Sequence, residues 1–85
     1  MSYWGRTRKH QAAEDWFFNG DRNTNMPLIL NDRVRVADGE HAGRGGCVVA
    51  LVGMDPEPVY VFEPTLPPLE WPEIPLSNLI RVGGW

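Results

Sequence analysis

A glycine-rich segment between two strand-like stretches is the feature that most constrains the fold of this chain. It runs from Asp32 to Leu51 and reads DRVRVADGEHAGRGGCVVAL. Arginine and valine alternate over Arg33–Val36, which is the period-two pattern of a strand with one buried face. Glycines at four positions between residues 39 and 46 permit turns and close approaches that other residues resist. The segment therefore predicts two paired strands, about residues 33–36 and 46–52, joined by a glycine loop.

Three further short strands are predicted after this pair. The apolar run Val59–Phe62 follows a turn that contains two prolines. Residues 63–75 hold five prolines, which cannot donate to a strand ladder, so this connection contributes at most a short edge strand near residues 73–76. A 3₁₀ turn over residues 77–79 and a last strand over residues 80–82 complete the pattern. Short strands separated by turns predict an all-β fold, here a small five-stranded barrel.

The N-terminal part differs from the barrel region. Residues 1–26 are interpreted as a partly flexible extension, and residues 27–85 as the barrel. Within the extension, residues 10–18 predict a short helix that ends at an Asn-Gly pair. Three consecutive aromatic residues at positions 16–18 are too apolar to be left in water, so we expect this helix to dock on the barrel.

The second and third predicted strands are apolar on both faces, which indicates that something covers the barrel. A bare barrel needs apolar residues only at its inward positions. Three segments could bury this outward apolar face: the helix with Trp16, the proline-rich connection with Trp71, or a partner chain. We expect the chain to cover itself, with Trp16 and Trp71 core-like and with Trp4 and Trp85 free or partner-bound.

Composition limits the cellular setting. The length of 85 residues allows one domain. The single cysteine, Cys47, excludes an intramolecular disulfide and favours a reducing compartment. No segment has the roughly 20 apolar residues of a membrane span. The sequence therefore predicts a cytoplasmic protein that does not enter the membrane.

The spacing of valines and glycines resembles a KOW motif, which is found in the SH3-like barrels of NusG-type transcription factors and of several ribosomal proteins. The closing PLSNLIRV resembles the end of such barrels, where a 3₁₀ turn precedes the last strand. The resemblance implies an SH3-like barrel that binds RNA, a ribosomal protein or another protein. The residues that carry it are Val34, Val36, Gly39, Glu40, His41, Ala42, Gly43, Gly46 and Val48.

In that family the glycine loop and its basic neighbours often contact the partner, which here points to Arg33, Arg35, His41 and Arg44. The charge of the chain weakens the nucleic-acid version of this expectation. The net charge is −3, and residues 27–63 carry six acidic residues against three arginines. Strong nucleic-acid binders usually present a basic face.

The tryptophans favour a protein partner, because tryptophan anchors many protein interfaces. Together with the acidic barrel and the surplus apolar faces, Trp16 and Trp71 predict a protein–protein interaction module. We expect an accessory domain of a small bacterial or phage protein, present as a monomer or weak homodimer. Binding of RNA or of the ribosome through the glycine loop is the alternative.

Neither catalysis nor a cofactor is predicted. Cys47 lies in an apolar strand without a basic neighbour in sequence, where a neutral, packed thiol is the norm. His41 and Glu40 alone do not supply the three or four ligands of a zinc site. The glycine loop lacks the lysine and the following helix of a phosphate-binding loop. We therefore expect a non-enzymatic protein with no metal site and no cofactor.

Overall fold

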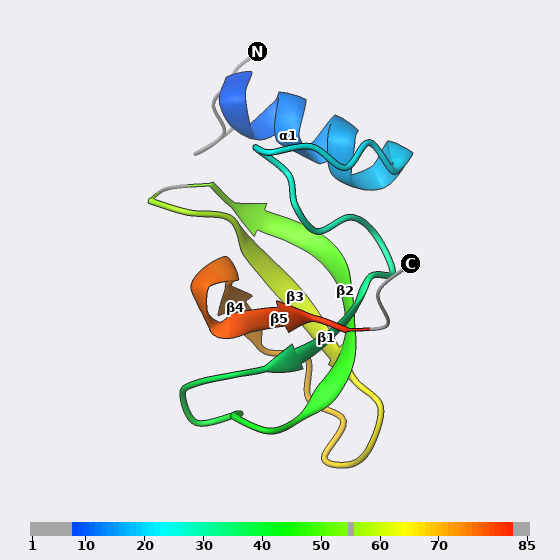
Figure 1. The fold of residues 1–85 in the computed structure, drawn as a ribbon, viewed down its shortest axis with the longest axis vertical. Helices are drawn as coiled ribbons and strands as arrows, with labels where there is room; N and C mark the ends of the chain where they lie inside the picture. The colour runs from blue at the N-terminus through cyan, green and yellow to red at the C-terminus, as the bar shows by residue number, and fades with distance from the viewer. Residues whose placement is uncertain (1–7, 55, 83–85) are drawn as a thin grey trace.

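The glycine-rich segment folds into two paired strands, as its pattern predicts (Figure 1). The structure, a computed structural model, describes residues 8–54 and 56–82, so Trp4 and Trp85 lie outside the described residues. In chain order the elements are α1 (Arg8–Asn19), β1 (Arg33–Val36), β2 (Gly45–Gly53), β3 (Val59–Pro64), β4 (Glu73–Pro75), the 3₁₀ turn η1 (Leu76–Asn78) and β5 (Leu79–Arg81).

One antiparallel sheet holds the five strands in the order β4-β3-β2-β1-β5. Its two edge strands are neighbours in the chain, and only the three residues of η1 separate them. No ladder joins β4 to β5 among the described residues, so the sheet is open between its edges. The fold is therefore mostly β with one short helix, and closure of the sheet into a barrel stays a prediction.

β1 has the bounds and the orientation that its alternation predicts. Val34 and Val36 are buried, whereas Arg33 and Arg35 are exposed on the opposite face. Asn31, in the bend that precedes this strand, has a φ of 69°, a conformation that asparagine adopts more readily than most residues. The period-two geometry of the strand thus separates core from solvent at every position.

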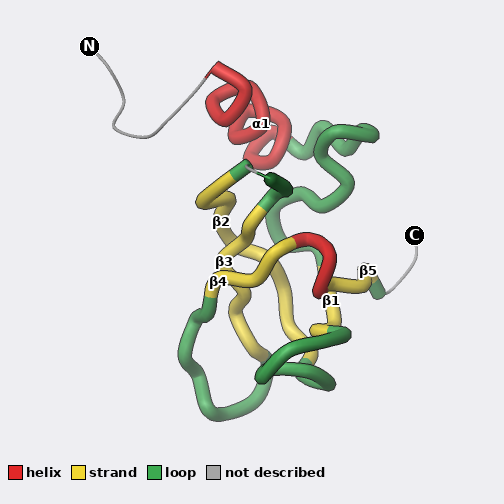
Figure 2. The backbone as a smooth tube through the Cα atoms, turned by 90° about the vertical axis from the view of Figure 1, so that its left-hand side faces the viewer, coloured by secondary structure: helices red, strands yellow, loops and turns green. Residues whose placement is uncertain are grey.

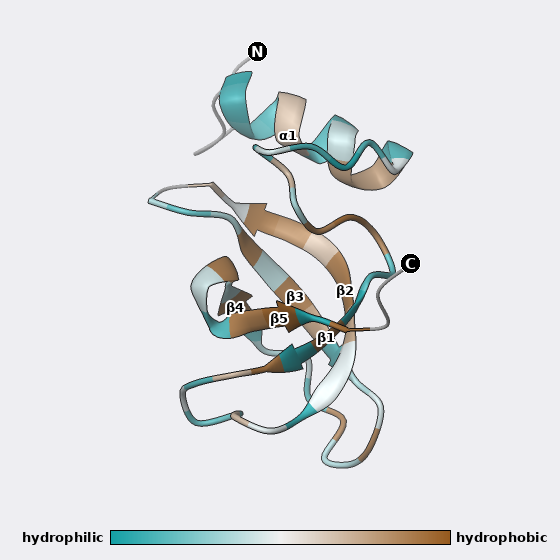
Figure 3. Cartoon of the chain, in the orientation of Figure 1, coloured by the Kyte–Doolittle hydropathy of each residue, from teal (hydrophilic) through white to brown (hydrophobic). Residues whose placement is uncertain are grey.

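β2 extends one residue beyond the predicted strand at each end and is irregular against β3. Val48 and Leu51 are both buried, although residues three apart lie on opposite faces of a regular strand. A register shift between Val48 and Ala50 supplies the extra residue that returns Leu51 to the core. Val52 is 41% exposed, so apolar surface remains on the outer side of this strand. The hydropathy colouring shows that much of β2 is hydrophobic (Figure 3).

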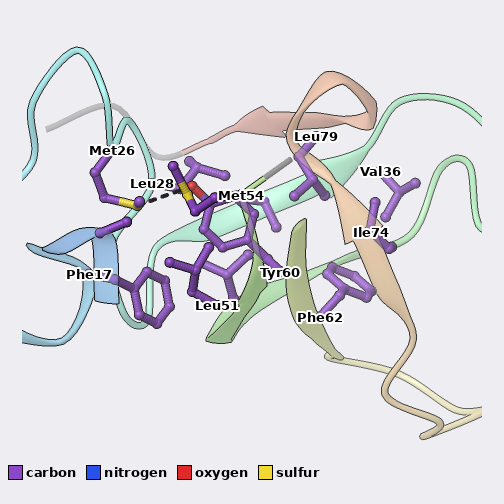
Figure 4. Close-up of a cluster of buried hydrophobic side chains, with 13 residues drawn as sticks. Phe17, Met26, Leu28, Val36, Leu51, Met54, Tyr60, Phe62, Ile74 and Leu79 are labelled. Atoms are coloured by element: carbon purple, nitrogen blue, oxygen red, sulfur yellow. Dashed lines mark hydrogen bonds between the residues drawn. The ribbon is translucent and has the colours of Figure 1, made fainter. Parts of the chain in front are cut away.

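α1 docks on the core through one face, at the end of the molecule opposite the long loops (Figure 2). The ring of Phe17 is fully buried, and its centroid lies 5.7 Å from that of the Tyr60 ring (Figure 4). The Tyr60 hydroxyl in turn donates to the sulfur of Met26 at 3.4 Å. The helix predicted over residues 10–18 is present, and it joins the same core as the strands. Its buried residues are His10, Ala13 and Phe17.

The segment between α1 and β1 is fixed at both of its ends. The helix ends with Gly20 at a φ of 79°, and the Asp21 N–H donates to the Trp16 carbonyl oxygen at 2.8 Å, as in a Schellman motif. At the other end, the buried carboxylate of Asp32 accepts the Ile29 N–H at 2.9 Å.

Arg22 bridges this segment to the Asp32 carboxylate. Its guanidinium donates to both oxygens of Asp32 and, at 3.0 Å, to the Pro27 carbonyl oxygen. The hydrogen bond to Asp32 raises the pKa of Arg22 above its usual value. These contacts hold the segment against the start of β1.

The expectation that Trp71 is core-like is wrong. Trp71 is 56% exposed, and every residue from 65 to 71 is exposed as well. The prolines keep this stretch out of the ladder, and α1 rather than the proline-rich connection completes the core. Trp16 differs, because it is half-buried and packs against the core cluster.

Candidate partner-binding surface

The most apolar exposed element of the structure is the proline-rich loop, residues 65–72, which connects β3 to β4. Leu66 is 69% exposed and Leu69 is 62% exposed, and Trp71 lies on the same loop. Half of the exposed large apolar side chains among the described residues therefore fall within six residues of sequence. Exposed apolar groups gathered in this way mark interaction sites more often than isolated ones do.

Hydrogen bonds hold the main chain of this loop while its apolar side chains remain in solvent. The Thr65 N–H donates to the Gly45 carbonyl oxygen at 3.0 Å. Nη2 of Arg44 donates to the Leu66 carbonyl oxygen at 2.7 Å and also to the Pro68 carbonyl oxygen. Near the other end, the Phe62 N–H donates to the Pro72 carbonyl oxygen at 2.9 Å. A loop held in this way loses little conformational freedom when it binds.

The glycine loop, residues 37–44, lies at the same end of the molecule as the proline-rich loop (Figure 1). Gly39 and Gly43 have φ values of 91° and 90°, which favour glycine strongly. The Gly43 N–H donates to the Val36 carbonyl oxygen at 2.7 Å, so the loop folds back onto the end of β1. Arg44 then leads into β2 and connects the two loops through its side chain.

Two neighbouring grooves run across this end of the sheet. The first has a volume of about 250 Å³, and Arg33 and Arg35 line it. The second has a volume of about 430 Å³ and is lined by Arg44 and the proline-rich loop. They form one continuous surface, because their linings share Gly43, Gly45 and Thr65.

The structure brings together three of the six site residues that the sequence suggests. Arg33, Arg35 and Arg44 line the two grooves, and Arg44 in addition donates hydrogen bonds to the loop, a role that its sequence position does not indicate. His41 lines neither of them, and its Nε2 lies 3.7 Å from Oε2 of Glu40.

The two tryptophans lie apart from the grooves. Trp71 is on the proline-rich loop but outside both linings. Trp16 lines a separate cavity of about 330 Å³ between α1 and the turn after β2.

Cys47 lies beside the grooves, and its chemistry is that of a neutral thiol. Burial and then the charge of Glu63 raise its pKa, while Arg33 lowers it by a smaller amount. The register explains these neighbours, since Arg33 and Glu63 both pair with Cys47 from the flanking strands. A raised pKa lowers the thiolate fraction at neutral pH, which disfavours a nucleophilic role.

The part of the chain that the structure describes has neither a metal-binding cluster nor a membrane-spanning helix. Residues 8–54 and 56–82 contain no group of three or more histidine, cysteine or acidic side chains placed to hold a metal ion. No helix within these same ranges has the length and apolar character needed to cross a membrane.

Sequence reasoning missed the two exposed leucines of the proline-rich loop and the place of Gly45 in the lining of both grooves. A signal for the leucines was present, because apolar residues between prolines cannot be buried by strand pairing and loops run over the surface.

Comparisons with models of protein families, with curated proteins and with solved structures found no match for this chain.

Proposed function

We propose that this chain is a non-enzymatic binding module that docks on a protein partner through its proline-rich loop. The observation that carries the proposal is the exposure of Leu66, Leu69 and Trp71 on a loop whose main chain is held by Arg44. Large aromatic residues are among the few that supply most of the binding energy at protein interfaces. A loop that is already ordered also loses less conformational entropy when it binds.

We also propose that the fold is an SH3-like barrel of the KOW type. The strand order supports this, as does the 3₁₀ turn that links the two edge strands. The glycine loop between β1 and β2 supports it as well, with positive φ values at Gly39 and Gly43.

The charge of the loop favours a protein over a nucleic acid as the partner of this surface. Glu70 and Glu73 are exposed in and beside the proline-rich loop, and Arg44 is the one basic residue that bonds to its main chain among the described residues. Carboxylates next to the apolar side chains repel phosphates, whereas they suit a protein surface with an apolar pocket and a basic rim.

A pull-down tests the proposal: the immobilised chain should capture its partner protein from a lysate of the cells that make the chain. The Leu69→Ser, Trp71→Ser double variant should lose the captured protein. A Phe18→Ser, Val52→Ser double variant should keep it, because it removes as many exposed apolar side chains outside the loop. Equal capture by both variants and the original chain would refute docking through the loop.

RNA binding is a second candidate, favoured by one observation. Arg33 and Arg35 are exposed on the same face of β1 and line one groove. Two phosphate contacts on single-stranded RNA should give a slope of about −1.4 for the logarithm of the binding constant against that of salt concentration. Loss of this slope in an Arg33→Gln, Arg35→Gln variant would support RNA binding at this groove. An RNA affinity of the original chain that does not depend on salt would refute it.

A further inference from the structure

The absence of a side chain at Gly45 is not required by the fold. Gly39 and Gly43 need their positive φ values, and a Cβ on Gly46 would lie 2.1 Å from the Glu63 carbonyl oxygen. Gly45 lies outside the left-handed region, and the heavy atom nearest to a Cβ placed there is the Val34 carbonyl oxygen at 4.0 Å. A glycine in the middle of a strand destabilises it by about 0.5–1 kcal/mol relative to alanine, and Gly45, the first residue of β2, carries a cost of the same sign.

Gly45 lies where a side chain would obstruct a ligand. It is exposed and belongs to both grooves, so a Cβ there would project into the surface that they share. Its direct cross-strand partner is Arg35, and paired residues of an antiparallel ladder direct their side chains to the same face. The missing side chain therefore leaves one flank of Arg35 open to a ligand.

The lining of the grooves selects an anionic ligand. Arg33, Arg35 and Arg44 contribute to it, and no carboxylate does among the described residues, although the whole chain has a net charge of −3. Arg33 and Arg35 are two residues apart on one face of β1, which spaces them about 6.6 Å along the strand. An extended peptide places alternate side chains at the same spacing.

We propose that the groove over Gly45 binds an extended segment of the partner that carries acidic residues at alternate positions. The two carboxylates pair with Arg33 and Arg35, and the peptide backbone passes over Gly45 toward the proline-rich loop. This inference rests on the proposed function, since the same partner would contact the loop. RNA fits the groove less well, because none of the described residues that line it has an aromatic side chain to stack a base.

Titration of the full chain with defined probes tests the inference by NMR. The first probe is a short peptide of alternating glutamate and threonine. The second has glutamine in place of glutamate, and the third is an oligouridine of the same length. We expect the glutamate peptide to shift the amide resonances of Gly43, Gly45 and Thr65, and the other two probes to bind more weakly. Tighter binding of oligouridine, or equal binding of the glutamine peptide, would overturn the proposal.

A matched pair of variants separates the groove from the fold. Gly45→Ala should weaken binding of the glutamate peptide about tenfold, equivalent to about 1.4 kcal/mol. Gly53→Ala is the control, because it lies on the same strand outside both grooves and its Cβ would meet the Val59 side chain at an ordinary 3.7 Å. Both variants should melt at or above the temperature of the original chain.

The outcomes also distinguish this inference from the proposed function. If Gly45→Ala binds the glutamate peptide as tightly as Gly53→Ala does, the inference is wrong. Loop docking would then still stand, provided that capture depends on Leu69 and Trp71. If capture does not depend on those two residues but the peptide binds at Gly45, the loop proposal fails and the groove remains a peptide site.

Discussion

Removing the Arg44 side chain should release the proline-rich loop without unfolding the sheet. Arg44→Ala deletes the two hydrogen bonds that Nη2 makes to the Leu66 and Pro68 carbonyl oxygens. Both bonds are exposed to water, so we take about 0.5–1 kcal/mol for each, below the range for buried bonds to a charged group, and about 1–2 kcal/mol for their combined contribution to loop order. A change of that size raises the equilibrium constant for loop opening about 5–30-fold.

Amide hydrogen exchange measures this opening residue by residue. The Thr65 N–H, which is bonded to the Gly45 carbonyl oxygen, should exchange faster by that factor in the variant. The Leu30 N–H, which is bonded to the Phe17 carbonyl oxygen beside α1, should exchange at its original rate. Arg35→Ala is the control variant, because it removes the same charge from the same end of the sheet and leaves the loop bonds in place.

Unchanged exchange at Thr65 in Arg44→Ala would refute the view that this side chain orders the loop. Equal acceleration in Arg44→Ala and Arg35→Ala would refute it too, because the effect would then follow from lost charge. If the loop does become mobile, partner binding should weaken as well, since the main chain must be ordered again on binding.

Three further perturbations test the core and its anchors. Burial raises the pKa of Tyr60 to about 12, so stability that is full below the ordinary pKa of 10 should fall by about 2–3 kcal/mol as pH rises from 10 to 12. Urea unfolding across that pH range measures the loss of stability. A Tyr60→Phe variant has no hydroxyl to titrate, so an equal loss of stability in that variant would refute the assignment to Tyr60. Asp32→Ala should lower the free energy of unfolding by about 2–3 kcal/mol, because it leaves the Arg22 guanidinium and the Ile29 N–H, both in part-buried hydrogen bonds, without their acceptor; an unchanged urea midpoint would count against this. Gly46→Ala should cost about 1–3 kcal/mol through its collision with the Glu63 carbonyl, whereas Gly45→Ala should cost nothing, and equal melting temperatures would refute the contrast.

The parts of the fold that the sequence predicts well are those with a local cause. The alternation over Arg33–Val36 predicts β1 to the residue, because it depends only on which face is buried. The end of α1 was similarly local, since Gly20 supplies the positive φ that stops the helix. β2 was harder, because the bulge after Val48 depends on its register with β3.

The parts that the sequence does not predict depend on contacts between distant segments. The sequence alone suggests that Arg44 is a free charge on a loop. In the fold it donates to the carbonyl oxygen of Leu66, which lies 22 residues away in the chain. Arg22 and Asp32 are ten residues apart, and no local pattern marks them as a pair. The misplacement of Trp71 has the same origin, since hydrophobicity alone does not tell which of two aromatic segments completes the core.

The position of β4 and β5 at opposite edges of the sheet bears on how this protein is made. Residues 73–81 supply the outer partner of β3 and the outer partner of β1. During synthesis, β1, β2 and β3 therefore emerge before either of their outer edges can be covered. Until those nine residues leave the ribosome, both edges present unpaired backbone groups, the state in which strands are most prone to pair with other chains. One short segment thus protects the whole sheet at once.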